Sequence, residues 1–417
     1  MAEWIETLLS DILVDKGYIR GPFGSALKRG DMKEDGIPVY EQQHAIYNSR
    51  DFRYYIDKQK FNEMKRYQVR KDDLIISCSG TVGKVSIIKD DDPKGIISQA
   101  LLLLRADTNK ILPLYLKYFF SSRDGYNAIV SRSSGSVQVN IAKRSVIEQI
   151  PLKLPQIKIQ RKIVGVLSSI DEKIEENKRI NNNLLEQIKT ICTAWLSEYK
   201  PFDGVMPSDW VETPLSDIAE FISGYSYKGT ELTDSTIAMA TIKNFDRKGG
   251  FKLDGYKEII PSSKLKESQH AELFDTLVAH TDLTQNAEVI GNAEPVMSKS
   301  GYDDIVFSMD LVKVLPKKDG VSKYLITAIL QDKKFKAHCL GYVNGTTVLH
   351  LSKKALPEYK LFLPSDFSTL KPLDEVVTAL YKQVSSNISE NTYLEELRES
   401  LLPKLMSGEL DVSDIEI

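Results

Sequence analysis

Apolar residues recur every three or four positions in two long stretches of the chain. In residues 163–195 the spacing is 4-3-4 throughout, provided that Asn177 and Asn181 fill a central gap. This spacing is that of the a/d seam of a coiled coil. Adding 210 to each number gives a second seam, with Asn387 and Asn391 in the same two places and an interruption at Arg398. The apolar seam positions are Ile163, Leu167, Ile170, Ile174, Leu184, Ile188, Ile191 and Trp195, then Leu373, Val377, Leu380, Val384, Leu394, Leu401 and Leu405.

The repeated asparagines indicate how the two helices pair. An asparagine in an apolar seam weakens the pair unless it finds a partner, and it fixes the register when it does. If the helices run antiparallel, Asn177 faces Asn391 and Asn181 faces Asn387, so these four residues are candidate register pins. In the alternative arrangement, each helix buries its apolar stripe on its own globular domain and the asparagines are solvated.

Prolines and glycines mark where the helices begin and end. Pro155 and Pro364 precede the two seams, Pro201 follows the first, and Gly408 follows the second. Proline and glycine stop helices. We therefore expect a globular domain at 1–155, a connecting helix at 156–207, a second globular domain at 208–365, and a second helix with a tail at 366–417.

The two globular segments open on the same sequence. Residues 4–12 read WIETLLSDI and residues 210–218 read WVETPLSDI, with seven of nine positions identical at an offset of 206. A two-copy repeat of this length is too long for a solenoid and indicates a duplicated unit of domain plus connector. The Trp, Leu and Ile positions of this opening are expected in the core.

Inside each segment, short apolar runs alternate with Gly, Asp and Ser turns, which is typical of strands. Strand-like runs at 100–104 and 310–314 each precede an expected helix, at 113–123 and 321–332. The fold class predicted is α+β: two mixed, mostly β domains, separated by two long helices that form an antiparallel coiled coil, with a pseudo-twofold repeat.

Composition and charge narrow the class of protein. An apolar fraction of 42% is enough to bury cores, and no run of 18 apolar residues exists to span a membrane. Cys78, Cys192 and Cys339 are odd in number and far apart, which favours reduced thiols and a cytoplasmic location. Residues 1–155 hold 24 Lys/Arg against 19 Asp/Glu, whereas residues 201–365 hold 19 against 22. In the second half, positive charge would have to be concentrated on one surface to attract nucleic acid.

Several motifs resemble one family. The opening W-x-E-x-x-L-x-D-I, the run DDLIISCSGTVGK at 72–84, and its variant FDTLVAHTDLTQN at 274–286 resemble the target-recognition domains of type I restriction–modification specificity subunits, the HsdS family. SGSVQVNI at 134–141 resembles the closing loop of these domains, and NGTTVLHL at 344–351 is the corresponding segment of the second copy. The second copy lacks the S-G-x-x-G glycines of the first. The resemblance spans the chain, and the order and duplication of the motifs are its most specific feature.

This resemblance implies a function and partners. Each globular segment would be a target-recognition domain that reads one half of a bipartite, asymmetric site in double-stranded DNA. The two helices would form a spacer that docks two methyltransferase (M) subunits, and restriction (R) subunits would join them. The chain itself would hold no cofactor, because S-adenosylmethionine, ATP and Mg are expected on the partner subunits. A seam of 33 residues is about 50 Å long, enough to serve half-sites roughly 34–36 Å apart.

Residues that suit DNA reading lie in the polar loops of both segments. Arg and Lys suit guanine, Asn and Gln suit adenine, and small hydroxyls suit phosphate. Three histidines in polar stretches, His44, His280 and His350, are expected at the surface. The candidates in the first segment are Lys28, Arg29, Gln42, Gln43, His44, Ser79, Thr81, Arg132, Ser134, Ser136, Gln138 and Asn140. Those in the second are Tyr225, Tyr227, Lys228, Lys243, Asn244, His280, Thr281, Thr284, Gln285, Tyr342, Asn344, Thr346 and Thr347.

Two other functions remain to be weighed. A stand-alone DNA-modifying enzyme is disfavoured, because an adenine methyltransferase needs an [Asp/Asn]-Pro-Pro-[Tyr/Phe] loop and the chain has no Pro-Pro. The segment GTVGK at 80–84 is too short for a phosphate-binding loop and is expected to be a turn, and no H-E-x-x-H or C-x-x-C occurs. No catalytic or metal-binding residue is therefore assigned. A coiled-coil scaffold whose domains bind something other than DNA is the second alternative.

Overall fold

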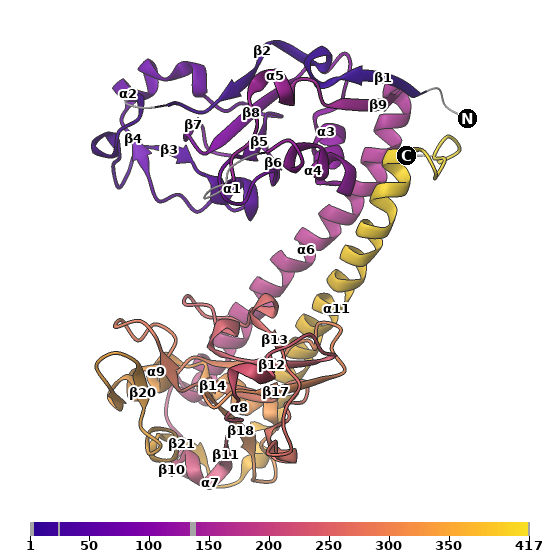
Figure 1. Cartoon of the computed structure of the whole chain (residues 1–417). Helices are drawn as coiled ribbons and strands as arrows, with labels where there is room; N and C mark the ends of the chain where they lie inside the picture. Colours follow the sequence, from indigo (N-terminus) through magenta and orange to yellow (C-terminus); the bar gives the residue numbers. More distant parts are fainter. Residues whose placement is uncertain (1–3, 24–25, 134–138, 416–417) are drawn as a thin grey trace. The chain divides into compact units, whose positions relative to one another are not determined.

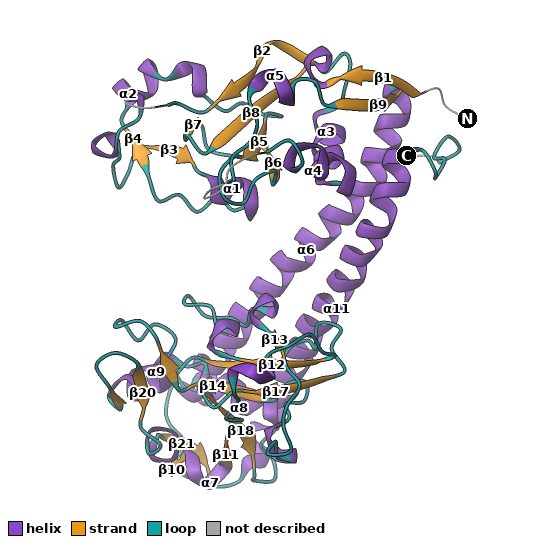
Figure 2. Cartoon of the chain, viewed as in Figure 1, coloured by secondary structure: helices purple, strands orange, loops and turns teal. Residues whose placement is uncertain are grey.

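The computed structural model describes residues 4–23, 26–133 and 139–415, and these form two compact units. The first unit comprises residues 1–172 and 394–417, and the second comprises residues 173–393. Each unit contains strands, short helices and a stretch of both long helices (Figures 1 and 2). The chain therefore has a mixed helix and strand fold with two long helices.

The core of the first unit is built on two small sheets. Continuous apolar runs such as LLLL in β8 form strands that are buried on both faces, with Leu101 to Leu104 fully inaccessible. The antiparallel four-stranded sheet has the order β2 (Leu13–Arg20), β8 (Leu101–Ala106), β5 (Leu74–Ser77), β6 (Val85–Ile87). The three-stranded sheet has the order β4 (Tyr55–Ile56), β3 (Ile37–Tyr40), β7 (Ile96–Ile97).

Short helices complete the first unit. The helix expected at 113–123 is present as α3, which packs against β6 and β8. The short helices of this unit are α1 (Gln42–Ile46), α2 (Lys58–Glu63), α3 (Pro113–Ser121), α4 (Arg123–Val130) and α5 (Arg144–Ile147).

The second unit has the same order of strands. Its four-stranded sheet is β11 (Ala219–Ser223), β18 (Leu311–Pro316), β14 (Thr276–Ala279), β16 (Ala293–Pro295), and its three-stranded sheet is β13 (Lys257–Glu258), β12 (Ile237–Ala240), β17 (Asp304–Phe307). A third sheet has the order β15 (Thr281–Asp282), β20 (Leu349–Leu351), β19 (Val343–Asn344). The helices are α7 (Leu215–Ile218), α8 (Lys323–Leu330), α9 (Lys333–Leu340) and α10 (Ala355–Glu358).

Corresponding glycines show how closely the two frames agree. A Cβ atom on Gly21 would lie 1.9 Å from the carbonyl oxygen of Ser98, and one on Gly224 would lie 2.0 Å from that of Ser308. Both glycines therefore allow a close backbone approach that no other residue permits.

The repeated opening sequence forms a two-stranded ribbon in each unit. β1 (Trp4–Leu8) pairs antiparallel with β9 (Pro151–Pro155), and β10 (Trp210–Pro214) pairs antiparallel with β21 (Lys360–Pro364). Leu9, Ile12, Leu215, Ile218 and Trp210 are buried, as expected for core positions. Trp4 and Leu8 are half-buried, and the prediction is wrong for Ile5, which is 62% exposed.

The two long helices are α6 (Ile157–Leu196) and α11 (Lys371–Ser407). Within the second unit the four asparagines are buried and bonded in pairs: Asn177 Nδ2 donates to Asn391 Oδ1 at 2.9 Å, and Asn387 Nδ2 donates to Asn181 Oδ1 at 2.8 Å.

Arg398, which interrupts the apolar seam, has an acidic partner in the first unit. Its guanidinium donates to Asp171 at 2.7 Å, and the same carboxylate accepts from Lys117 and Tyr118. Burial would raise the pKa of Asp171, but Lys117, Arg398 and Tyr118 outweigh it and hold that pKa below its usual value.

Candidate DNA-reading surfaces

Three separate segments meet on one side of the first unit. The turn after β5 pairs with the closing segment: Gly80 N donates to the carbonyl of Val139 and Ile141 N to that of Cys78, both at 2.9 Å. The hydroxyl of Ser79 donates to Asn140 Oδ1 at 2.7 Å, and the side chain of Gln42 accepts from Ser79 N. The predicted residues Gln42, Ser79 and Asn140 therefore form one continuous polar surface.

The second unit brings together the corresponding segments. Leu351 N donates to the carbonyl of His280, just as Ile141 N does to that of Cys78. Thr281 and Asp282 on β15 pair with His350 and Leu349 on β20. Gln285 donates its side-chain amide to the carbonyl of Thr346 at 2.8 Å, so the turn at 280–285 and the loop at 344–347 lie in contact.

Two side chains in this turn of the second unit, His280 and Asp282, have shifted pKa values. Burial, together with nearby His350 and Lys353, lowers the pKa of His280 to about 4, so its ring is neutral at pH 7. The carboxylate of Asp282 accepts from Thr284 and from the backbone of Val289, and these donors lower its pKa although burial opposes them. Asp282 thus serves to hold the turn.

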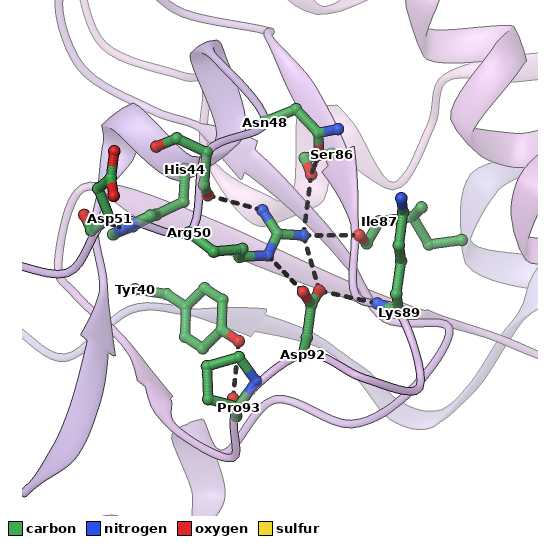
Figure 3. A network of polar contacts seen from close by, with 11 residues as sticks. Tyr40, His44, Asn48, Arg50, Asp51, Ser86, Ile87, Lys89, Asp92 and Pro93 are labelled. Atoms are coloured by element: carbon green, nitrogen blue, oxygen red, sulfur yellow. Dashed lines mark hydrogen bonds and ion pairs between the residues drawn. The ribbon is translucent and has the colours of Figure 1, made fainter. Parts of the chain in front are cut away.

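A polar network fixes the segment that follows α1 in the first unit (Figure 3). Arg50 makes a two-point ion pair with Asp92, with both contacts at 2.7 Å, and donates to the carbonyl of Ile87. Asn48, which has a φ of 50°, accepts from the hydroxyl of Ser86. These bonds tie the segment at 48–50 to the edge strand β6. Tyr47, which precedes this segment, is 77% exposed, and it is not among the DNA-reading residues predicted from the sequence.

Two of the predicted reading residues are instead caps of buried turns. The prediction that His44 lies at the surface is wrong: it is fully buried, and its ring contacts the backbone of Glu41 and Asp51. Burial lowers the pKa of His44, which keeps the ring neutral. Asn244 occupies the corresponding turn, is also fully buried, and accepts from Thr241 N as His44 does from Glu41 N. Both side chains stabilise the backbone from inside.

Tyr225 and Thr281, predicted as DNA-reading residues in polar loops, are also buried. The hydroxyl of Tyr225 bonds with Glu231 and Ser262, and that of Thr281 donates to Asp310. Long-range partners of this kind leave no local signal in the sequence. Ser134, Ser136 and Gln138 lie outside the described residues.

The remaining candidates are exposed or half-buried. Arg29, Gln42 and Gln43 line one cavity of about 330 Å³ in the first unit, together with Arg53 and Gln99, which the sequence did not single out. Arg53 is held there by Glu41 at 2.8 Å. The fully or partly accessible candidates are Lys28, Arg29, Gln42, Gln43, Ser79, Thr81, Arg132, Asn140, Tyr227, Lys228, Lys243, His280, Thr284, Gln285, Tyr342, Asn344, Thr346, Thr347 and also His350.

The segment at 80–84 is a turn. Gly80 and Gly83 have φ values of 66° and 87°, and Gly83 N donates to the carbonyl of Ser77, which closes the turn onto β5. Among the residues that the structure describes, no cluster of three or more His, Cys, Asp or Glu side chains could hold a metal ion. None of the described helices is long and apolar enough to cross a membrane.

Comparison with known proteins gives a consistent result. The family model described as "Type I restriction modification DNA specificity domain" matches residues 24–186. The type I restriction enzyme MjaIX specificity subunit of Methanocaldococcus jannaschii is 23% identical over 325 residues, 72% of this chain and 70% of the relative. The HindI specificity subunit of Haemophilus influenzae is 22% identical over 389 residues, 79% of this chain and 84% of the relative.

A solved structure has the same fold. The type I restriction–modification S subunit from M. genitalium superposes with a TM-score of 0.53 at 15% identity, covering 97% of this chain and 96% of that one. The sequence matches thus indicate one class, the specificity components of restriction–modification systems. Within this class the chain is similar to the type I restriction–modification specificity subunits, whose DNA specificity domain matches residues 24–186.

Proposed function

We propose that this chain recognises DNA sequence for a type I restriction–modification complex, with each unit reading one half of a bipartite, asymmetric site. The observation that carries the proposal is the pair of equivalent polar surfaces, at 79–81 with 140 and at 280–285 with 344–347, on two units with the same strand order. Because the frames agree and the surface residues differ, the two halves of the site should differ in sequence.

We further propose that α6 and α11 pair as an antiparallel coiled coil, which gives the chain its pseudo-twofold repeat. The bonds of Asn177 with Asn391 and of Asn181 with Asn387 support this arrangement, since only antiparallel helices match both pairs. Residues 1–155 and 208–365 would be the two target-recognition domains, and residues 156–207 and 366–417 would contain the two spacer helices. The helices would hold the two domains at a fixed spacing.

The chemistry would reside in partner subunits. Two methyltransferase subunits would dock on this chain and supply S-adenosylmethionine and adenine methylation, and restriction subunits would supply ATP- and Mg-dependent cleavage. This chain would be non-catalytic and would work in the cytoplasm beside the DNA. The stand-alone enzyme and the coiled-coil scaffold have no observation in their favour.

The proposal is tested by co-expressing the chain with its methyltransferase subunit and mapping methylated adenines across a genome. We expect one bipartite motif with a spacer of fixed length, absent when this chain is omitted. Methylation without a bipartite motif, or methylation that does not depend on this chain, would rule the proposal out.

A further inference from the structure

The second unit carries a hairpin with an unusual concentration of positive charge. Residues 243–252 contain four basic side chains, Lys243, Arg247, Lys248 and Lys252, and one acid, Asp246. All four basic residues are exposed. Residues 201–365 as a whole have an excess of acids, with 19 Lys/Arg against 22 Asp/Glu, so the hairpin is locally basic in an acidic segment.

The hairpin is held rigidly at its base. Phe245 pairs with Phe251 across the two arms, and their rings pack edge to face against the core with centroids 6.1 Å apart. Lys252 N donates to the carbonyl of Asn244, whose side-chain amide donates to the carbonyl of Lys252. A rigid base means that little conformational entropy is lost when the tip binds a partner.

The tip of the hairpin is fastened to the edge strand of the sheet. Gly250 N donates to the carboxylate of Glu294 on β16 at 2.7 Å, and the amide of Asn292 donates to the carbonyl of Asp246. The carboxylate of Asp246 accepts from Lys248 N inside the turn. Arg247 reaches Glu288 at 3.1 Å with 66% of its side chain exposed, and such surface pairs exchange easily with another anion.

This hairpin corresponds to the segment after α1 in the first unit. Both follow a turn capped by a buried side chain, His44 in one unit and Asn244 in the other, and both are fastened to the edge strand of the four-stranded sheet. In the first unit that turn carries Gln42, which bonds with the polar surface at Ser79. By this correspondence the basic hairpin would lie beside the reading surface of its own unit, and Arg247 reaches Glu288, which follows the turn at 280–285 in the sequence.

We propose that residues 243–252 bind the phosphate backbone of double-stranded DNA next to the half-site that the second unit reads. Lysines act as point charges for phosphate, and backbone contacts position a protein on DNA without adding sequence information. Gly249 and Gly250, with φ values of 95° and 109° and open space around their Cβ positions, let a phosphate approach the backbone. The inference rests on the proposed function and adds to it a surface that orients the second unit.

The test compares Arg247→Ala/Lys248→Ala with the wild type in the assembled complex with methyltransferase subunits. The matched control is Lys317→Ala/Lys318→Ala, which removes an adjacent exposed pair elsewhere in the same unit. Affinity is measured by fluorescence anisotropy across a series of salt concentrations, on a duplex with the mapped site and on a scrambled duplex. The methylation motif of each variant is mapped in parallel.

Each phosphate contact contributes about 0.9 to the slope of log affinity against log salt, so the hairpin variant should lose about 2 from this slope. Binding should weaken by a similar factor on both duplexes, the motif should stay unchanged, and the control should match the wild type. Lys252→Gln, a milder change, should lower the slope by about 1.

An unchanged slope in both hairpin variants would overturn the inference. A slope that stays constant while the complex loses methyltransferase subunits, as seen by sedimentation, would also overturn it and would assign the hairpin to a protein partner. If the wild-type complex itself shows no bipartite motif, then the proposed function fails, which is a separate result.

Discussion

His44 and Asn244 show how two different side chains serve one structural role. Each is fully buried and accepts the backbone N–H that opens a tight turn, at 2.6 Å and 2.9 Å. Both types of residue suit DNA reading chemically, and for that reason the sequence suggested them as contacts. Burial depends on long-range packing, so the pattern of polar residues alone did not distinguish a cap from an exposed reader.

Glu294 makes the stability of the second unit depend on pH. Its carboxylate accepts from Gly250 N at the tip of the hairpin, and burial raises the pKa of this carboxyl group to about 7 from an ordinary value of 4.5. The folded chain therefore binds this proton more tightly than the unfolded chain. Stability from this group is fully present below pH 4.5 and is lost as pH rises through 7.

Glu294→Gln is expected to remove the pH-dependent contribution of this carboxyl group to the free energy of unfolding. Urea unfolding at pH 5 and pH 8, followed by fluorescence in a Trp4→Phe background, reports on Trp195 and Trp210 of the second unit. The free energy of unfolding of Glu294→Gln minus that of the wild type should be larger at pH 8 than at pH 5. Glu288→Gln, a partly exposed neighbour, serves as the control. Equal pH dependence in the wild type and in Glu294→Gln would contradict the expectation.

At the scale of elements, periodicity predicts helices better than strands. The 4-3-4 spacing predicts both long helices, and the expected helices at 113–123 and 321–332 are present as α3 and α8. Neither α4 nor α9 was expected from the sequence. Strand pairing between β2 and β8, about 80 residues apart, has no local signal.

The buried asparagines allow a direct test of the helix pairing. In Asn177→Leu, Asn391 loses a hydrogen-bond donor inside the seam, and leaving a buried polar group without a partner costs about 1–3 kcal/mol. Asn177→Leu/Asn391→Leu replaces both partners and should recover most of this loss. Both are measured as free energies of unfolding in urea.

Asn182→Leu is the matched control, because Asn182 is exposed on the same helix. It should change stability by less than about 0.5 kcal/mol. If the two single losses, Asn177→Leu and Asn391→Leu, simply added in the double variant, the asparagines would not be coupled and the pairing would be refuted.

For the whole molecule, the two units should act independently on specificity. Gln43 lines the same cavity as Gln42, which bonds with the polar surface of the first unit, and Gln285 lies on the polar surface of the second unit. Gln43→Ala should relax the methylation motif only in one half, and Gln285→Ala only in the other, with a loss of discrimination of about 1–3 kcal/mol at each affected base pair. Genome-wide methylation maps of the two variants check this. A change that appears in the same half for both would contradict it.

The duplication of the chain can be predicted from the sequence, whereas its long-range side-chain contacts cannot. The repeated nonapeptide and the matched asparagines indicate duplication, because both survive as residue identities at a constant offset. Contacts such as Arg398 with Asp171 and Arg50 with Asp92 join residues 227 and 42 positions apart. Only the fold brings these residues together, so no spacing rule could have found them.

The terminal ribbons have a consequence for how such a protein can change over time. Because β1 pairs with β9 and β10 pairs with β21, the chain enters and leaves each globular part at neighbouring points. A segment with adjoining ends can be exchanged as a cassette without rebuilding its surroundings. Recombination between genes at the sequences WIETLLSDI and WVETPLSDI would therefore transfer one whole globular part, with its connecting helix, in a single event.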